Sequence, residues 1–129
     1  MRRPRREILI RAGAAAIRAR LLDTACADRV WQALPIYSVV VIEDGLLQFA
    51  IPVAAVPEPA ARRIVKPGEI AFWAEQGRVL IAFAPPSPGG GADLSLPAAC
   101  NVWAVARDDV AALSRVAAGD RAALLEADS

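Results

Sequence analysis

The stretch GEIAFWAEQGRVLIAFAPPSP, residues 68–88, carries the clearest structural signal in this chain. Gly68 opens a short apolar run, the turn at 75–77 follows, and a second apolar run ends in a proline cluster. Short apolar runs bounded by Gly and Pro are typical of β-strands joined as a hairpin. The stretch therefore predicts two antiparallel strands, over 69–73 and 78–84, and a loop over 85–97.

Similar patterns occur on both sides of this hairpin. Residues 17–21 alternate between apolar and charged side chains, which is typical of a strand with one buried face. Residues 36–43 are rich in β-branched side chains and precede Asp44-Gly45, a strong hairpin signal. We expect about eight strands, over 7–11, 17–21, 36–43, 46–51, 69–73, 78–84, 101–106 and 121–125, and an irregular connection over 53–66.

Two short helices are expected between these strands. The first follows Asp23 or Thr24, either of which can cap it, and ends before Pro35. The second follows the aspartates at 108–109, which we interpret as a cap rather than a catalytic carboxylate pair, and ends at Gly119. These elements predict a mainly β fold, a small closed β-barrel in a single domain over 1–129. One apolar core should contain Trp31, Leu34, Phe49, Phe72 or Trp73, and Phe83.

Charge is unevenly distributed, although the net charge is only +1. We expect the arginine-rich residues 1–6 to form a flexible, solvated terminus and 127–129 a flexible tail. No aromatic residues or basic helix face accompany these arginines, so we expect neither a nucleic-acid nor a membrane partner. The apolar run at 8–10 is too short for an export signal, and no stretch is long enough to span a membrane, which predicts a cytoplasmic protein.

The chain contains no histidine and only two cysteines, Cys26 and Cys100. The commonest general base near neutral pH and the commonest metal ligand are therefore absent. We expect no metal and no cofactor, and we assign no catalytic residue. Any enzymatic chemistry would have to use carboxylates, Lys66 or Tyr37. The loop at 85–91 is interpreted as a movable flap rather than a phosphate-binding loop, because its prolines remove backbone donors.

Taken in order, several segments resemble a family of uncharacterised prokaryotic proteins with a cyclophilin-like β-barrel fold. The resemblance covers nearly the whole chain and implies the fold without an assigned reaction. The matching segments are LLDTACADRVWQALP (21–35), FAIPV (49–53), GEIAFW (68–73), LIAFAPPSP (80–88) and VAAGDRAALLE (116–126).

True cyclophilins resemble the same fold and use an arginine to polarise a proline carbonyl in a groove lined by aromatic and amide side chains. This chain lacks their Phe-His-Arg and Gln-Gly-Gly-Asp signatures, and Arg18, Arg20 and Arg78 stand in no matching motif. Because a shared fold does not transfer an activity, we do not assign isomerase activity from the resemblance.

We interpret the chain as a small-molecule or peptide-binding barrel without evident catalytic residues, and we expect it to form a homodimer. Two alternatives stay open: an enzyme, either a weak peptidyl-prolyl isomerase or a carboxylate-based one, and an assembly module. The aromatic residues Tyr37, Trp73 and Trp103 can line a pocket or pack in the core. The turn at 44–45 should make Tyr37 and Gln48 cross-strand neighbours. The candidate ligand-binding residues are Tyr37, Gln48, Trp73, Arg78 and Ser87, with the loop at 85–91 as a movable rim.

Overall fold

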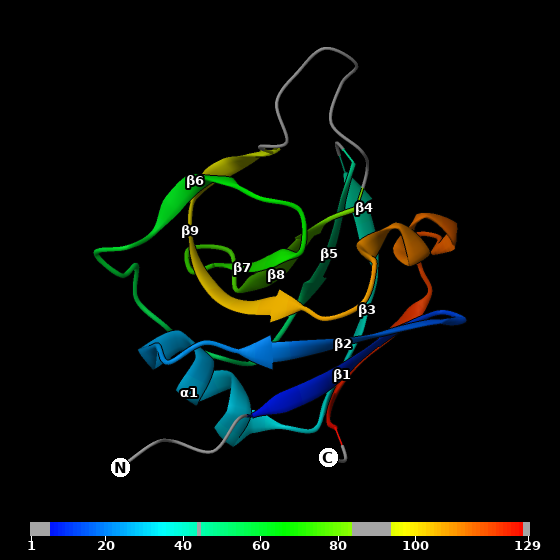
Figure 1. The fold of residues 1–129 in the computed structure, drawn as a ribbon, viewed down its shortest axis with the longest axis horizontal. Coiled ribbons are helices and arrows are strands. Elements are labelled where there is room, and N and C mark those ends of the chain that lie inside the picture. The colour runs from blue at the N-terminus through cyan, green and yellow to red at the C-terminus, as the bar shows by residue number, and fades with distance from the viewer. Residues whose placement is uncertain (1–5, 44, 84–93, 128–129) are drawn as a thin grey trace.

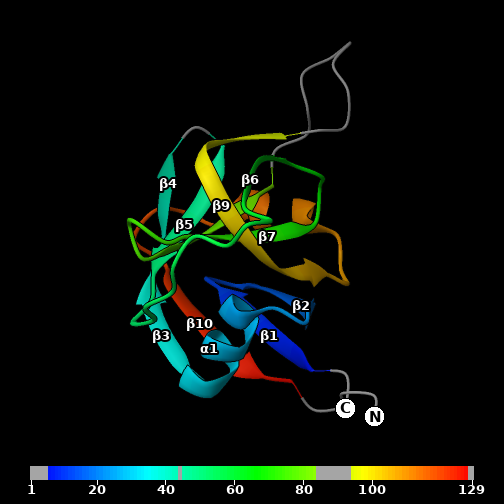
Figure 2. The same ribbon diagram turned by 90° about the vertical axis from the view of Figure 1, so that its left-hand side faces the viewer.

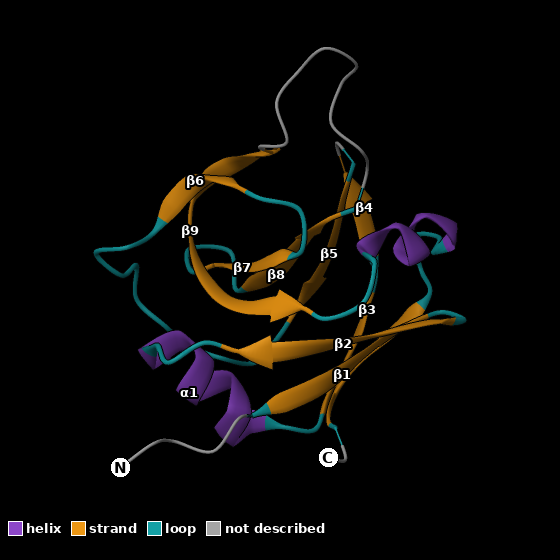
Figure 3. Ribbon diagram, in the orientation of Figure 1, coloured by secondary structure: helices purple, strands orange, loops and turns teal. Residues whose placement is uncertain are grey.

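A computed structural model of the protein describes residues 6–43, 45–83 and 94–127. The fold is a nearly closed antiparallel β-barrel (Figure 1). Helix α1 and the short 3-10 helix η1 lie on opposite sides of it (Figure 3). The elements are β1 (Glu7–Ala12), β2 (Ala15–Leu21), α1 (Ala25–Ala33), β3 (Ile36–Val39), β4 (Val41–Glu43), β5 (Leu46–Ala50), β6 (Arg62–Val65), β7 (Glu69–Trp73), β8 (Arg78–Ala82), β9 (Leu94–Ala106), η1 (Val110–Arg115) and β10 (Arg121–Glu126).

The strands form one sheet in the order β3-β10-β1-β2-β9-β7-β8-β5-β4, and β6 pairs with β9 outside this path. The ends of the sheet approach each other, because Ser38 Oγ donates to the carbonyl of Ala50 at 2.6 Å. This bond places β3 beside the end of β5. The expected mainly β barrel is therefore confirmed.

The hairpin predicted from residues 68–88 is present as β7 and β8. Ile70 lies opposite Ile81 and Trp73 lies opposite Arg78. Gly77 has a φ of 64°, a left-handed conformation that glycine adopts without strain, and its N–H donates to Trp73 O at 2.8 Å. A glycine in this turn is thus required by the backbone. The part of the stretch from residue 84 onward lies outside the described residues.

Ten strands are found in the described ranges, rather than about eight, and the main differences lie in three segments. The predicted strand 36–43 is interrupted at Val40. Its N–H donates to the carbonyl of Asp120 and its carbonyl accepts the N–H of Gly119, both just before β10. β6 lies in the connection expected to be irregular, and β9 begins at Leu94, within the expected loop. Both gain strand structure because they pair with each other, a contact between distant segments that local sequence does not reveal.

Both helices begin at a capping side chain. Thr24 Oγ1 accepts the Ala27 N–H at 3.0 Å, and Asp109 Oδ1 accepts the Ala111 N–H at 2.9 Å. Asp108 instead accepts the backbone N–H of Arg18 on β2, at 2.8 Å. Each carboxylate of the 108–109 pair therefore binds a backbone amide. No helix in the described ranges is both long enough and apolar enough to cross a membrane.

Two apolar clusters lie on the two faces of the strands β5, β7, β8 and β9. The first fills the barrel, and its largest fully buried side chains include Trp103, Phe49 and Phe72. Trp31, Leu34 and Phe83 pack against it, which confirms the predicted core. The second cluster lies outside the barrel under β6 and includes Leu80, Leu96 and Cys100, with Trp73 packed against it. Trp73 is thus on the outer face, and Trp103 is part of the barrel core.

Candidate functional site

Three of the predicted site residues lie together on the outer face of β5, β8 and β7. Leu47 and Phe49 point into the barrel, so Gln48 between them faces outward. Arg78 lies opposite Trp73 on β7 and opposite Ala50 on β5. Because directly opposed residues in an antiparallel pair share a face, Gln48, Trp73 and Arg78 form one side-chain cluster, called here the Gln-Arg-Trp cluster.

A hydrogen bond joins two members of the cluster. Arg78 Nη1 donates to Gln48 Oε1 at 3.4 Å, a long and therefore weak bond. Gln48 is only 3% exposed, whereas Arg78 is half-buried and keeps further N–H groups of its guanidinium for other acceptors. Trp73 Nε1 is buried and has no hydrogen-bond partner among the described residues. The accessible donors of the cluster are therefore the N–H groups of the half-buried Arg78 guanidinium, and a carbonyl or carboxylate oxygen is the acceptor that fits them.

The other two predicted residues are not brought to this cluster. Tyr37 is 73% exposed on β3 and lies opposite Ala123 of β10. Gln48 lies opposite Val41 and Leu80, so the expected pairing of Tyr37 with Gln48 is wrong. The physical reason is the interruption at Val40, which leaves Tyr37 in the part of the strand that pairs with β10. Ser87 and the loop at 85–91 lie outside the described residues.

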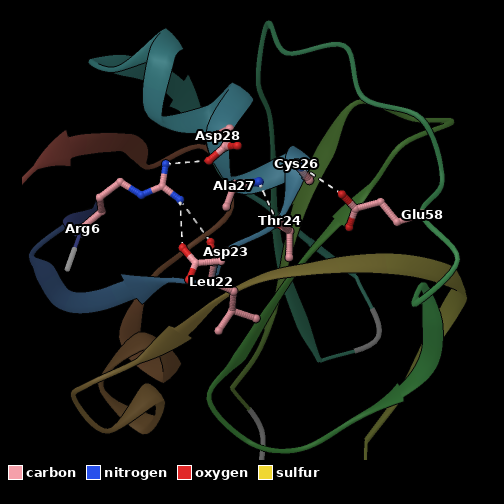
Figure 4. Close-up of polar contacts among 8 residues, drawn as sticks. All are labelled: Arg6, Leu22, Asp23, Thr24, Cys26, Ala27, Asp28 and Glu58. Atoms are coloured by element: carbon pink, nitrogen blue, oxygen red, sulfur yellow. Dashed lines mark hydrogen bonds and ion pairs between the residues drawn. The ribbon is translucent and has the colours of Figure 1, made fainter. Parts of the chain in front are cut away.

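A second polar cluster, which the sequence reasoning missed, connects β9 to the start of α1. Asn101 is 1% exposed; its Oδ1 accepts the Glu58 N–H at 2.8 Å, and its Nδ2 donates to the Val56 carbonyl at 2.9 Å. Glu58 Oε2 in turn accepts the Cys26 N–H at 3.0 Å (Figure 4). The sequence does contain a signal for this cluster: Asn101 is a lone amide in the apolar run CNVWAVA (100–106). A polar side chain buried in such a run needs hydrogen-bond partners.

The chemistry of this second cluster is structural. Burial raises the pKa of the Cys26 thiol to about 12, and the hydrogen bond with Asn101 opposes that shift only in part. Burial also raises the pKa of Cys100, to about 11. Both thiols are therefore neutral near pH 7, and neither has the thiolate character of a nucleophile. The Glu58 carboxylate lies against the first turn of α1, where it accepts a backbone N–H that has no partner within the helix.

Arg6 contradicts the expectation that residues 1–6 form a solvated terminus. Its side chain is 13% exposed and donates to Asp28 Oδ1 at 2.8 Å and to the Leu22 carbonyl at 3.2 Å (Figure 4). The guanidinium also lies 6.0 Å from the ring of Trp31, within the range of a cation–π contact. The bond to Asp28 holds Arg6 against the first turn of α1, directly before the start of β1 at Glu7. Residues 1–5 lie outside the described residues.

Two surface depressions occur away from the Gln-Arg-Trp cluster. One, of about 210 Å³, lies between α1 and the segment after β5; the other, of about 510 Å³, lies between the β1–β2 turn and η1. Among the described residues, no three His, Cys, Asp or Glu side chains are grouped so that they could hold a metal ion. The lining residues are Arg29, Gln32, Ala33, Pro52, Val53 and Ala54 for the first, and Ala14, Ala15, Ala111, Ala112, Ser114 and Arg115 for the second.

Comparison with known proteins agrees with this architecture. A family model described as cyclophilin-like matches residues 6–124. The solution structure of a hypothetical protein from Archaeoglobus fulgidus is similar, with a TM-score of 0.78 and 22% sequence identity over 98% of each chain. At this identity the likeness concerns the fold alone, and a search of curated proteins finds no match. The family match extends over nearly the whole barrel, from Arg6 to Leu124, and the chain therefore belongs to the cyclophilin-like family.

Proposed function

We propose that the protein binds a small molecule or a short peptide through the Gln-Arg-Trp cluster, and that the ligand presents a carbonyl or carboxylate oxygen. One observation carries this proposal. A nearly buried amide, a half-buried guanidinium and a buried indole N–H that has no partner among the described residues meet on one outer face of the barrel. Ligand sites typically combine apolar walls with a few converging polar groups, and the half-buried ring of Trp73 supplies apolar surface on this face.

Binding is supported better than covalent catalysis by the described side chains. Both thiols are neutral near pH 7 because burial raises their pKa values. The carboxylates at 108–109 each accept a backbone N–H, so they are engaged in holding the fold. The Gln-Arg-Trp cluster itself contains donors and an amide, groups that orient a ligand and do not accept a proton near neutral pH.

Thermal-shift screening tests the proposal. A library of small carboxylates and proline-containing peptides should include a compound that raises the melting temperature, because a ligand that binds only the folded state stabilises it. The shift should disappear in Arg78→Ala and persist in Arg29→Ala, a control on the exposed side of α1. Binding should also change the fluorescence of the wild type more than that of Trp73→Phe. A ligand whose stabilisation is unaffected by Arg78→Ala would place binding elsewhere.

Peptidyl-prolyl isomerisation is the second candidate, and the contact between Arg78 and Gln48 favours it. An arginine held by an amide beside an indole can donate to the carbonyl of a bound proline peptide. An assay of cis/trans interconversion in a proline tetrapeptide tests this candidate. The wild type should accelerate interconversion and Arg78→Lys should lose most of that acceleration, because a lysine cannot reproduce the planar fork of donors. Equal rates with and without the wild type would remove this candidate.

We also propose a homodimer formed through β6, and the cytoplasm as the compartment. Within the described ranges β6 pairs only with β9, and its Ile64 is 49% exposed. An edge strand with exposed apolar side chains is a ready partner for a second copy. Light scattering should give twice the chain mass, and Ile64→Lys should return it to the monomer. Two unpaired cysteines are consistent with a reducing compartment, which cell fractionation would test.

A further inference from the structure

Four exposed arginines gather on one outer face of the barrel, on β1, β2 and β10. They are Arg11, Arg18, Arg20 and Arg121, and we call this surface the basic face. Their positions follow from strand alternation, because the residues between them point inward: Ile10, Ala12, Ile17, Ala19 and Ala122 are all buried in the barrel. The strands β2, β1, β10 and β3 are consecutive in the sheet and lie side by side in Figures 1 and 2.

The strand register places exposed aromatic and apolar side chains among these arginines. Ala123 of β10 lies opposite both Arg11 of β1 and Tyr37 of β3, so Tyr37 and Arg11 belong to one cross-strand row. Arg121 lies opposite Val39, which is 54% exposed. In a further row Leu9 lies opposite Arg18. Tyr37, the only tyrosine of the chain and 73% exposed, is the aromatic side chain of this surface.

The positive charge of the basic face is not neutralised locally. No ion pair joins any of the four arginines to a carboxylate among the residues described by the structure. Glu7 lies opposite Arg20 but its carboxylate binds Arg107, at 2.9 Å. Asp108, next to β2, accepts the backbone N–H of Arg18. The outward-facing positions of β1, β2, β3 and β10 thus hold these four arginines and one carboxylate, that of Glu7, so this face carries a local excess of positive charge.

From this arrangement we propose that the basic face binds single-stranded nucleic acid, with phosphates on the arginines and a base stacked on Tyr37. Each of the four arginines lies in a different cross-strand row, so together they form a diagonal track from β2 over β1 to β10. Residues two apart on a strand, and diagonal neighbours on adjacent strands, lie about 7–8 Å from each other, so a phosphate backbone can run along this track. An open sheet face with an exposed aromatic ring is a surface that splayed bases can stack on. Guanidinium groups also bind phosphate oxygens through paired N–H donors.

The alternatives fit these observations less well. A second copy of the chain would bring like charges together, which opposes self-association through this face. An acidic protein would be attracted by the charge but gives no reason for the tyrosine. A membrane surface calls for an amphipathic element that inserts apolar side chains. The large apolar side chains that this sheet face exposes in the described structure are Val39 and Tyr37, while Leu9 is half-buried. From the sequence we expected no nucleic-acid partner, because no aromatic residue accompanies the arginines near the N-terminus. The strand register brings Tyr37 and Arg121 to the same face as Arg11.

Fluorescence anisotropy with a fluorescein-labelled oligouridylate tests the proposal. The probe should be about 12 nucleotides long, a length within the site sizes of single-strand-binding folds. Binding should weaken with salt, and log K against log salt should have a slope of about −2 to −3, corresponding to three or four phosphate contacts. The double variant Arg11→Gln/Arg121→Gln should bind at least tenfold more weakly and with a slope about 1.4 units shallower. Arg63→Gln, on β6 across the molecule, is the matched control.

The tyrosine separates nucleic acid from other polyanions. Tyr37→Leu should weaken oligouridylate binding about tenfold, and Tyr37→Phe should restore it, because stacking needs the ring and not the hydroxyl. All the substituted side chains are exposed, and circular dichroism will verify that each variant keeps the fold. The proposal is overturned by absent binding in low salt, by binding that the double variant retains, or by polyglutamate or phosphatidylserine vesicles that bind as tightly as oligouridylate regardless of Tyr37.

Discussion

Asn101 and Glu58 are joined across 43 residues of sequence by a hydrogen bond of 2.8 Å from the Glu58 N–H to Asn101 Oδ1. The same amide donates to Val56, so one buried side chain holds the connection between β5 and β6 against β9. Replacing it leaves a backbone donor and an acceptor without partners. Asn101→Ala should therefore lower the free energy of unfolding by about 2–3 kcal/mol in chemical denaturation. A loss below about 0.5 kcal/mol would mean that water replaces these bonds.

Glu58 extends that connection to the helix, because its carboxylate accepts the Cys26 N–H in the first turn of α1. Glu58→Ala removes the acceptor and should cost about 1 kcal/mol of unfolding free energy, as the loss of a capping group does. Glu58→Gln is the matched control, since an amide oxygen still accepts the bond, and it should recover at least half of the loss. Equal losses in the two variants would contradict the capping role.

Arg6 ties the start of β1 to α1 through Asp28, Leu22 and the ring of Trp31. Because its side chain is only 13% exposed, Arg6→Ala should destabilise the protein by about 2 kcal/mol, more than removal of a surface charge. Arg29 is an exposed arginine on α1, and Arg29→Ala should change the free energy of unfolding by less than about 0.5 kcal/mol. Denaturation curves that do not distinguish the two variants would show that Arg6 contributes nothing specific.

Trp31 packs on the barrel core from α1, beside Arg6. Trp31→Ala should cost about 3 kcal/mol of unfolding free energy, the lower end of the range for a large aromatic residue, because the side chain is only half-buried. Trp31→Phe keeps a ring at the same place and should cost less than about 1.5 kcal/mol. A Trp31→Ala loss well under 1 kcal/mol would show that α1 is not docked on the core.

The two cysteines should be unreactive in the folded protein. Burial raises the pKa of Cys26 to about 12 and that of Cys100 to about 11, so both remain protonated at pH 8. A colorimetric thiol reagent at that pH should therefore label the native protein far more slowly than the denatured chain. The sign of the pH dependence follows as well: above the ordinary thiol pKa of 9.0 the unfolded chain loses protons that the native state keeps, so stability should fall as pH rises from 9. Rapid labelling of the native protein would contradict the buried positions.

Local sequence was sufficient for the elements whose signals lie within a few residues. The hairpin of β7 and β8, the cap at Thr24 and the alternation in β2 all rest on turn chemistry and side-chain periodicity. The barrel core could be predicted for the same reason, since Phe49, Phe72 and Trp31 occupy the apolar phases of their own elements. The placement of Gln48, Trp73 and Arg78 on strands was correct, but no local signal indicates that they share a face.

Tertiary structure decided everything that depends on which strands become neighbours. β6 and the first half of β9 carry weak strand patterns and become strands because they pair with each other. Tyr37 pairs with β10 and not with the strand of Gln48, because Val40 enters the barrel core and bonds to the start of β10. Arg6 and Asn101 find their partners in segments distant in sequence. Periodicity and turn chemistry act over a few residues, and so they determined most of the strands and the core. The Gln-Arg-Trp cluster and the basic face exist only because folding sets the register between distant strands.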